Sequence, residues 1–320
     1  MSGPIEVSGP IDVIGIGAVA VDDVLFLSQF PRPDSKMPVL RRERHSGGLC
    51  GTALVAARRL GRTCAYAGCL GDDGLSRFIL DGFAAEGVSL DHVIRRPGAV
   101  PFHSTIVVDT SQKTRTILYE EQGVIGADPS EPSDDVLRSA RVLLVDHIGL
   151  EGMVRAARVA RAAAIPVVAD LERNGQPLVK TLLDLSDHLI VPAEFAGAIT
   201  GRKDPGAAAR ALWRQDRAAV VVTCGVDGSW YVSAEEPGAL YHQPAFRVEV
   251  VDTNGCGDVF HGAYAAGLSE GMGIRDRVRL AAAVAALKAT QPGGQSGIPV
   301  RARAERFLQE RAAEAPRSSG

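Results

Sequence analysis

A glycine-rich turn between two aspartates carries the residue types best suited to chemistry. Alternating apolar residues over 246–250 predict a strand before it, and a helix is predicted to begin near Asp258. Gly255 and Gly257 have no Cβ, so the backbone amides of residues 255–258, that of Cys256 included, can turn towards a ligand. Unpaired N–H groups at a helix N-terminus favour anions. The turn reads Asp252-Thr253-Asn254-Gly255-Cys256-Gly257-Asp258.

Phosphoryl transfer is the chemistry that this turn suits. The amides can stabilise charge on the transferred group, while Asp258 orients an attacking hydroxyl and accepts its proton. A calcium loop is excluded, because its fifth and twelfth positions, counted from Asp252, would be Cys256 and Ala263. A structural glycine turn, with Asp258 only capping the helix, remains an alternative on this stretch alone.

The elements around the turn alternate between strands and helices. Val/Ile/Leu-rich strands between alanine-rich helices predict an α/β fold, with a central, mostly parallel sheet flanked by helices on both faces. The predicted helices include Thr52–Leu60, Leu75–Glu86, Met153–Ala164 and Gly206–Gln215. The predicted strands are Ile11–Ile16, Thr63–Gly68, Val142–Asp146, Pro166–Asp170, His188–Val191, Ala219–Thr223 and Trp230–Val232.

Two alternating stretches, about 24–45 and 100–120, do not fit that sheet. Within the second, His103–Val108 and Thr114–Tyr119 flank a polar turn, which is a hairpin signal. We expect both stretches to form a small β element, possibly a lid, on a single domain over residues 1–315. A disordered tail is expected at 316–320.

Composition limits the partners. The 320 residues carry a net charge of −3, so no basic field favours nucleic acid. No apolar run approaches the ~20 residues of a membrane-spanning helix. The five cysteines lack the paired spacing of a zinc site and are expected to be reduced thiols, which predicts a cytoplasmic protein.

The glycine-rich turn resembles the D-T-x-G-x-G-D signature of the PfkB/ribokinase-like carbohydrate kinases. Other segments resemble the family in the expected order, from about Ile11 to Pro299. They are Gly47-Gly48, Ala56-Ala57-Arg58-Arg59-Leu60-Gly61, Leu70-Gly71-Asp72-Asp73-Gly74 and Val221-Val222-Thr223-Cys224-Gly225-Val226-Asp227-Gly228.

This resemblance implies a ribokinase-like fold and ATP- and Mg2+-dependent phosphorylation of a sugar hydroxyl, on a ketose or pentose-like sugar. Asp258 would be the general base and the 255–257 amides an anion hole. The resemblance also implies a homodimer through the lid and a site for a monovalent cation such as K+, at Asp252 and carbonyls near 290–294. Sugar contacts would come from Asp22, Gly47, Gly48 and Thr52, and nucleotide contacts from Thr223, Gly225 and Gly228.

The sequence departs from the family pattern at several positions. Relatives usually carry Asn where Thr52 stands, and both polar positions of their N-x-x-E motif are alanine here, Ala193 and Ala196, with Glu194 between them. The C-terminal third is similar to sulfofructose kinases, which also lack that motif. Their expected sulfonate-holding arginine is replaced by His147. The similar segments are 241–246, 259–263 and 285–294.

Two other functions are open at this point. The lost N-x-x-E motif allows a sugar- or nucleotide-binding protein without catalysis. Gly15–Ala20 fits G-x-G-x-x-A after a strand and allows an NAD-linked oxidoreductase, which would require a pyrophosphate-binding helix to follow. Of the histidines, His147 is expected to face the cleft from a strand end, and His261 to pack or face solvent.

Overall fold

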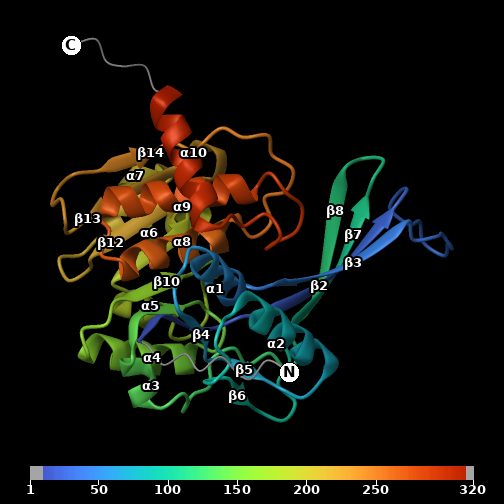
Figure 1. The fold of residues 1–320 in the computed structure, drawn as a ribbon, viewed down its shortest axis with the longest axis horizontal. Coiled ribbons are helices and arrows are strands. Elements are labelled where there is room, and N and C mark those ends of the chain that lie inside the picture. Colours follow the sequence, from blue (N-terminus) through green and yellow to red (C-terminus); the bar gives the residue numbers. More distant parts are fainter. Residues whose placement is uncertain (1–9, 315–320) are drawn as a thin grey trace.

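A mostly parallel sheet forms the centre of the molecule (Figure 1). The computed structural model describes residues 10–314, so the predicted tail at 316–320 lies outside the described part. Within those residues the sheet has eight strands, in the order β14-β13-β12-β11-β10-β9-β1-β4. They are β1 (Ile11–Ile16), β4 (Cys64–Tyr66), β9 (Ala140–Val145), β10 (Val167–Asp170), β11 (His188–Pro192), β12 (Ala219–Thr223), β13 (Ser229–Ser233) and β14 (Tyr241–Gln243).

All strand pairs from β4 to β12 are parallel, and β13 and β14 continue the sheet antiparallel. Parallel strands place their carboxyl ends along one edge, where ligands bind in open α/β sheets. The α/β prediction is confirmed, and each of the seven predicted strands is present within three residues at either end.

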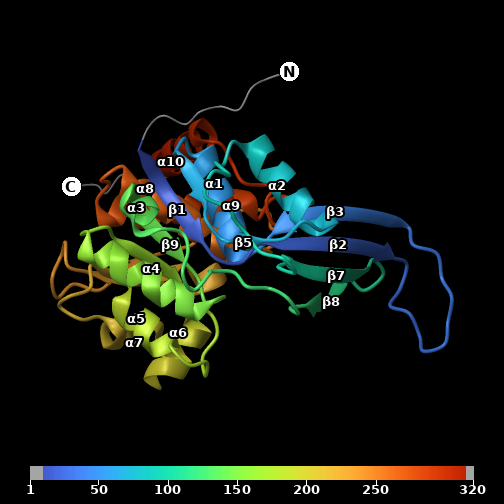
Figure 2. The same ribbon diagram turned by 90° about the horizontal axis from the view of Figure 1, so that it is seen from below.

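Helices cover both faces of the sheet (Figure 2). Neighbouring strand residues alternate between two hydrophobic cores; Leu144 packs in one and Leu143 in the other. Helices α1 (Leu49–Arg59), α2 (Gly74–Glu86), α8 (Cys256–Ser269), α9 (Ile274–Lys288) and α10 (Arg301–Glu314) cover one face. The other face carries α3 (Asp134–Arg138), α4 (Leu150–Ala162), α5 (Val179–Leu185), α6 (Ala193–Thr200) and α7 (Pro205–Leu212).

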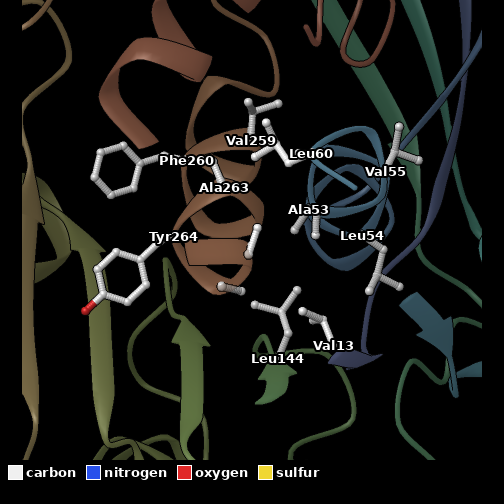
Figure 3. Close-up of a cluster of buried hydrophobic side chains, with 14 of the residues drawn as sticks. Val13, Ala53, Leu54, Val55, Leu60, Leu144, Val259, Phe260, Ala263 and Tyr264 are labelled. Carbon is white, nitrogen blue, oxygen red and sulfur yellow. The ribbon is translucent and has the colours of Figure 1, made fainter. Parts of the chain in front are cut away.

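Helices α1 and α8 lie against each other over the sheet, with buried side chains between them (Figure 3). Their approach depends on Gly262, because a Cβ there would lie 2.0 Å from the carbonyl oxygen of Ala53. Val259 and Ala263 of α8 are fully buried, and Leu54 of α1 is too. The contact fixes the N-termini of both helices at the carboxyl edge of the sheet.

A second sheet, which we call the lid, projects from the core (Figures 1 and 2). Its strands run in the order β3-β2-β7-β8, with β2 and β7 parallel in the middle. They are β2 (Ala20–Leu27), β3 (Arg41–Gly47), β7 (Phe102–Asp109) and β8 (Thr114–Glu120). The predicted hairpin at 103–119 is therefore confirmed. A two-strand pair, β5 (Cys69–Leu70) with β6 (Ile94–Arg95), lies outside both sheets.

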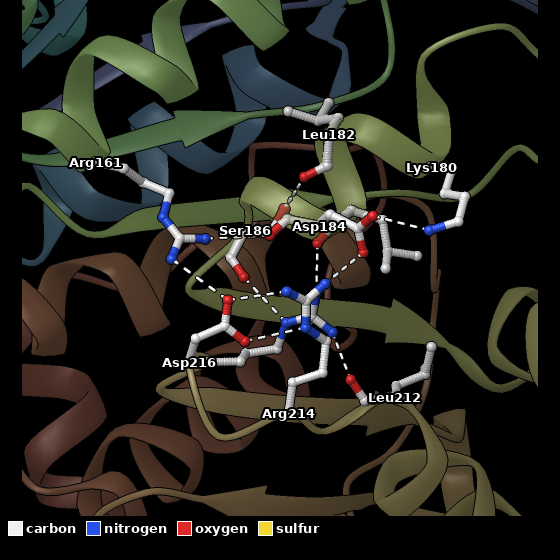
Figure 4. Close-up of polar contacts among 10 residues, drawn as sticks. Arg161, Lys180, Leu182, Asp184, Ser186, Leu212, Arg214 and Asp216 are labelled. Carbon is white, nitrogen blue, oxygen red and sulfur yellow. Dashed lines mark hydrogen bonds and ion pairs between the residues drawn. The ribbon is translucent and has the colours of Figure 1, made fainter.

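Buried Arg217 ties helices together at the opposite edge of the main sheet. Its guanidinium donates to the carbonyl oxygens of Leu212, Leu183 and Ser186, at the ends of α7 and α5, and a cation there complements the helix dipoles. Arg214 beside it binds Asp184 at 2.6 Å and Asp216 at 2.9 Å, as Figure 4 shows. This edge is stabilised by polar contacts and lies away from the strand ends that bind ligands.

The strand predicted over residues 246–250 is wrong. The segment forms no strand, and Val250 is 54% exposed. Pro244 lacks an N–H at its start, and Phe246 packs edge-on against Phe307 of α10, with ring centroids 5.3 Å apart. The apolar alternation there does not mark a sheet face, because Phe246 packs against a helix while Val250 is largely exposed.

No helix within residues 10–314 is long and apolar enough to cross a bilayer.

We predict that Gly262→Ala destabilises the protein, because the added methyl group must push α1 and α8 apart. Overpacking of this kind costs about 1–3 kcal/mol, partly offset by the higher helix propensity of alanine. Urea unfolding measures the change. Gly74→Ala is the matched control, since its Cβ would meet nothing nearer than Arg77 at 4.0 Å. Equal stability of Gly262→Ala and the wild type would contradict the close packing.

Candidate active site

A cavity of about 430 Å3 lies where the lid meets the carboxyl edge of the main sheet. Both helices that meet through Gly262 begin on its wall, α1 after Gly48 and α8 after Gly255. Two helix N-termini therefore face one space, which favours a ligand with negative charge. Seven of the sequence-predicted site residues line it: Asp22, Gly47, Gly48, Thr52, Gly255, Gly257 and Asp258.

Gly255 caps α8 in a left-handed conformation, with φ of 77°. A Cβ at this position would lie 2.9 Å from the carbonyl oxygen of Gly294, so the turn and the loop after α9 touch through glycine alone. Cys256 differs from its neighbours. Its amide donates to the Thr253 oxygen at 3.2 Å and its thiol to Ala285 at 3.6 Å, and it is not among the residues that line the cavity.

Asp258 lies in the first turn of α8, two residues after the start of the helix. Burial raises the pKa of its carboxyl well above the usual range, and the carboxyl groups of Asp170, Glu172 and Asp146 raise it further. Burial also raises the pKa of Asp146 to about 7 and that of Asp170 well above its usual range. The carboxyl edge of the sheet thus gathers acids that repel one another's charge.

His261 holds the first turn of α8 against the sheet. Its Nδ1 lies 2.8 Å from the Gly257 carbonyl oxygen and 3.2 Å from Asp170 Oδ2, and its Nε2 lies 3.0 Å from the Ile190 oxygen. From the sequence, His261 was expected either to pack or to face solvent. The side chain is buried, but it makes polar contacts through both ring nitrogens. Because β10 and β11 supply these partners, the orientation of the helix start depends on the strand ends.

Asp22 and the Gly47-Gly48 turn line the same cavity. Gly48 has φ of 88°, and a Cβ there would lie 2.5 Å from the Val19 Cα, so only glycine fits. Burial raises the pKa of Asp22, against a hydrogen bond from Ser104 that lowers it. Thr52 is 1% exposed and accepts a bond from Gln295 at 3.3 Å.

Several cavity residues were not identified from the sequence. Arg115 and Tyr119 reach the cavity from β8, and Glu172 and Arg173 follow the carboxyl end of β10. The position after a parallel strand would have indicated the second pair. His147, which was predicted to face the cleft from the end of β9, does line the cavity.

The proposed nucleotide residues lie elsewhere along the same edge. Thr223 ends β12, and Gly225 and Gly228 bound a short 3-10 turn after it. They are not among the residues lining the cavity, and neither is Asp252, which precedes the α8 turn. Glu194, in the altered N-x-x-E segment, is exposed at the start of α6.

The dinucleotide-binding alternative lacks its structural context. After β1 the chain continues into strand β2 of the lid, not into a helix. A pyrophosphate at Gly15–Ala20 would therefore have no following helix N-terminus to bind.

The cavity and fold can be compared with known proteins. A model of the pfkB family of carbohydrate kinases matches residues 11–301. A ribokinase of Haemophilus influenzae is 27% identical over 308 residues, which cover 92% of this chain and 97% of that protein. A 5-dehydro-2-deoxygluconokinase of Bacillus cereus is 24% identical over 94% of this chain and 95% of its own.

Solved structures agree with the sequence comparison. A crystal structure from Agrobacterium tumefaciens, provisionally named a ribokinase, superposes with a TM-score of 0.87 at 26% identity and covers 96% of this chain and all of its own. Arabidopsis thaliana ribokinase, solved with ribose and ATP, gives 0.83 at 24% identity over 94% of this chain and 99% of its own. The predicted ribokinase-like fold is confirmed.

We predict that the His147 ring stays neutral at pH values well below those at which histidine side chains usually take up a proton. Burial and the nearby charge of Arg173 lower its pKa to about 4, so NMR should show no titration of this ring between about pH 8 and pH 5.5. The unfolded chain takes up the proton near pH 6.5, so this histidine's contribution to stability is lost as pH falls from there towards 4. His147→Asn identifies the signal, and a midpoint near 6.5 would contradict the burial.

Proposed function

The chain belongs to the pfkB family of carbohydrate kinases, which are phosphotransferases acting on sugar hydroxyls, and from this premise we propose that it transfers the γ-phosphoryl group of ATP to a hydroxyl of a ketose or pentose-like sugar. The observation that carries the proposal is the position of Asp258. It lies in the first turn of α8 and lines the same cavity as Asp22 and the Gly48 turn.

Asp258 is the general base in this proposal. Its raised pKa makes the carboxylate a stronger base, which accepts a proton from an attacking hydroxyl more readily. The free amides at the start of α8, including that of Gly257, stabilise negative charge on the phosphoryl group as it moves. Base and anion hole lie on one helical turn, so the hydroxyl and the phosphoryl group are positioned together.

The sugar occupies the cavity under the lid. Asp22 accepts hydrogen bonds from hydroxyl groups, and the Gly47-Gly48 turn lets the ligand approach the backbone. Ser104 and Tyr119 of the lid line the same space and add polar and aromatic contacts. A volume of about 430 Å3 accommodates a single monosaccharide better than an oligosaccharide.

ATP extends along the strand ends from α8 to the turn after β12, where Thr223, Gly225 and Gly228 contact the nucleotide. Mg2+ would come with the phosphates and would neutralise part of their charge. Within residues 10–314 no group of three His, Cys, Asp or Glu side chains could hold a metal alone. Mg2+ commonly keeps several waters and takes one or two carboxylates, and Glu172 on the cavity wall fits that role.

We propose a homodimer through the lid. Every residue of its edge strand β8 is exposed, and Ile117, Leu118 and Tyr119 are 44–59% exposed. An exposed apolar edge strand is a ready site for strand pairing or for cover by a partner. A second lid offers the same strand and the same apolar residues, so a symmetric contact can cover both.

We predict that Asp258→Asn lowers kcat by about 10²–10⁴-fold, because the isosteric amide cannot accept the proton. ADP release is measured across ketoses, pentoses, nucleosides, sugar phosphates and sulfofructose, and ATP affinity by calorimetry. Asp276→Asn is the matched control, an aspartate in the first turn of α9 that is exposed and outside the cavity. It should keep wild-type turnover.

The pH dependence of kcat/KM is a second test of the role of Asp258. Asp258 acts only when ionised, so the acid limb of kcat/KM should lie above the usual aspartate range. Asp170→Asn removes a repelling neighbour and should move that limb to lower pH. An active Asp258→Asn would refute its role as the base. Bound ATP with no turnover on any sugar would favour a binding protein instead.

We predict that the wild type runs at twice the chain mass in light scattering, and that Leu118→Lys shifts it to one chain mass. The buried lysine charge would oppose the lid contact. Val300→Lys, at a residue equally exposed but outside the lid, is the control. A wild type that stays monomeric at all concentrations would refute the lid dimer.

A further inference from the structure

Lys288 is a buried cation directly behind the phosphate-binding turn. It ends helix α9 and has no exposed surface, although lysine is almost never fully buried without a partner. Its Nζ donates to the main-chain oxygen of Asp252 at 2.9 Å. Asp252 is three residues before Gly255, so the ammonium group lies behind the turn that begins α8.

Hydrogen-bond donors occupy both carboxylate oxygens of Asp252. Oδ1 accepts from the Asn254 amide at 2.9 Å and from Arg115 of the lid at 3.1 Å. Oδ2 accepts from the Gly293 amide at 2.9 Å. Burial raises the pKa of Asp252, but the Asn254 and Gly293 amides, with the charges of Lys288 and Arg115, outweigh it, so the net shift is downward and the group stays ionised.

A carbonyl in the loop after α9 is occupied as well. The Ala289 oxygen accepts the amides of both Val251 and Asp252, at 2.8 and 3.1 Å. A monovalent cation at Asp252 would have to displace these donors. It would also lie beside a buried ammonium group that bonds the same residue, where like charges repel strongly. The donor set present does not fit the K+ site expected at Asp252 and the neighbouring carbonyls.

We propose that the Lys288 ammonium group takes the place of a monovalent cation beneath the anion hole, so that phosphoryl transfer by this chain needs no K+. The inference rests on the proposed kinase function. The ammonium group is covalently attached and holds Asp252 by its carbonyl oxygen, while Gly293 holds the carboxylate. It acts through the turn as a positioning residue and does not touch the substrate.

The charge of Lys288 is set by groups on each neighbouring element. Its pKa is lowered, chiefly by burial and also by Arg115 of the lid, while Cys256 and Asp258 of α8 and Asp252 of the turn act in the opposite direction and favour the charged form. The positive charge adds to that of the α8 N-terminus, on the side where phosphoryl charge would gather. A resident cation of this kind cannot exchange with those in solution.

The first test compares wild-type turnover in KCl, NaCl and choline chloride at equal ionic strength. We expect equal rates in all three salts. A wild type that needs K+ overturns the proposal, whatever the variants do.

The second test is Lys288→Met, which is one atom shorter, removes the charge and leaves the place of Nζ vacant. We expect kcat to fall roughly tenfold, and K+ or ammonium ions to restore it, whereas choline is too large to enter. Lys180→Met is the matched control, an exposed lysine on α5 that pairs with Asp184, and it should respond to no salt. A fully active Lys288→Met that is indifferent to K+ overturns the proposal.

Thermal melting separates this inference from the kinase proposal. KCl, compared with choline chloride, should raise the Tm of Lys288→Met and leave that of the wild type unchanged. This reading stands even if no sugar is phosphorylated, an outcome that would count against the kinase function alone. If Lys288→Met does not fold, K+ that raises the wild-type Tm or rate more than Na+ would still refute the inference, and equal effects would support it.

Discussion

The contact between α1 and α8 is the constraint on which the site depends. The two helices begin in segments more than 200 residues apart in sequence, yet Gly262 lets their backbones approach until a methyl group would not fit. Because both helices start at the carboxyl edge of the sheet, their N-termini converge on one cavity. The Gly48 turn, which we propose faces the sugar, and the Gly255 turn, which we propose faces the phosphates, are thereby held in a fixed relation, and neither turn could fix that relation alone.

The charged groups around the cavity come from several elements of the fold. The strand ends supply Asp146, Asp170 and Glu172, which raise the pKa of Asp258. His261 acts against them by lowering the pKa of Asp258, and the helix N-terminus also favours the ionised carboxylate. Concentrating carboxyl groups where little solvent reaches costs stability, and proteins tolerate such a cost chiefly at functional sites. The orientation of His261 between Asp170 and the Gly257 carbonyl shows how the sheet edge and the helix start share one polar network.

Local patterns in the sequence were sufficient for the elements whose faces are buried. β12, for example, was predicted residue for residue, since continuous Val residues occur where both faces are covered. Residues 246–250 misled because their apolar residues alternate as in a strand, although Phe246 packs against α10 and Val250 stays exposed. The turn at Gly255 was identifiable from glycine and aspartate spacing. Arg115 was not, because nothing local indicates that strand β8 folds back over the site.

Lys288 was missed for a related reason. In the sequence it is an ordinary basic residue at a helix C-terminus, where lysine usually stays in water and complements the dipole. Only the tertiary arrangement brings the Asp252 carbonyl to it and closes the loop over residues 293–294. A fixed charge that replaces a mobile one cannot be inferred from spacing, since it depends on what surrounds the group in three dimensions.

The ion pair between Arg115 and Asp252 has a consequence for the timing of the catalytic cycle. It joins a lid strand to the start of the turn proposed to bind phosphate, across 137 positions of sequence. The pair is partly exposed and therefore modest in strength, within about 1 kcal/mol. Energetic coupling between the lid and the turn is nevertheless reciprocal, so each affects the other equally. Under the proposed function, a sugar that draws the lid inward would also stabilise the turn proposed to bind the nucleotide, and a nucleotide that orders the turn would favour the closed lid. Loss of either ligand loosens both, so departure of one product hastens that of the other.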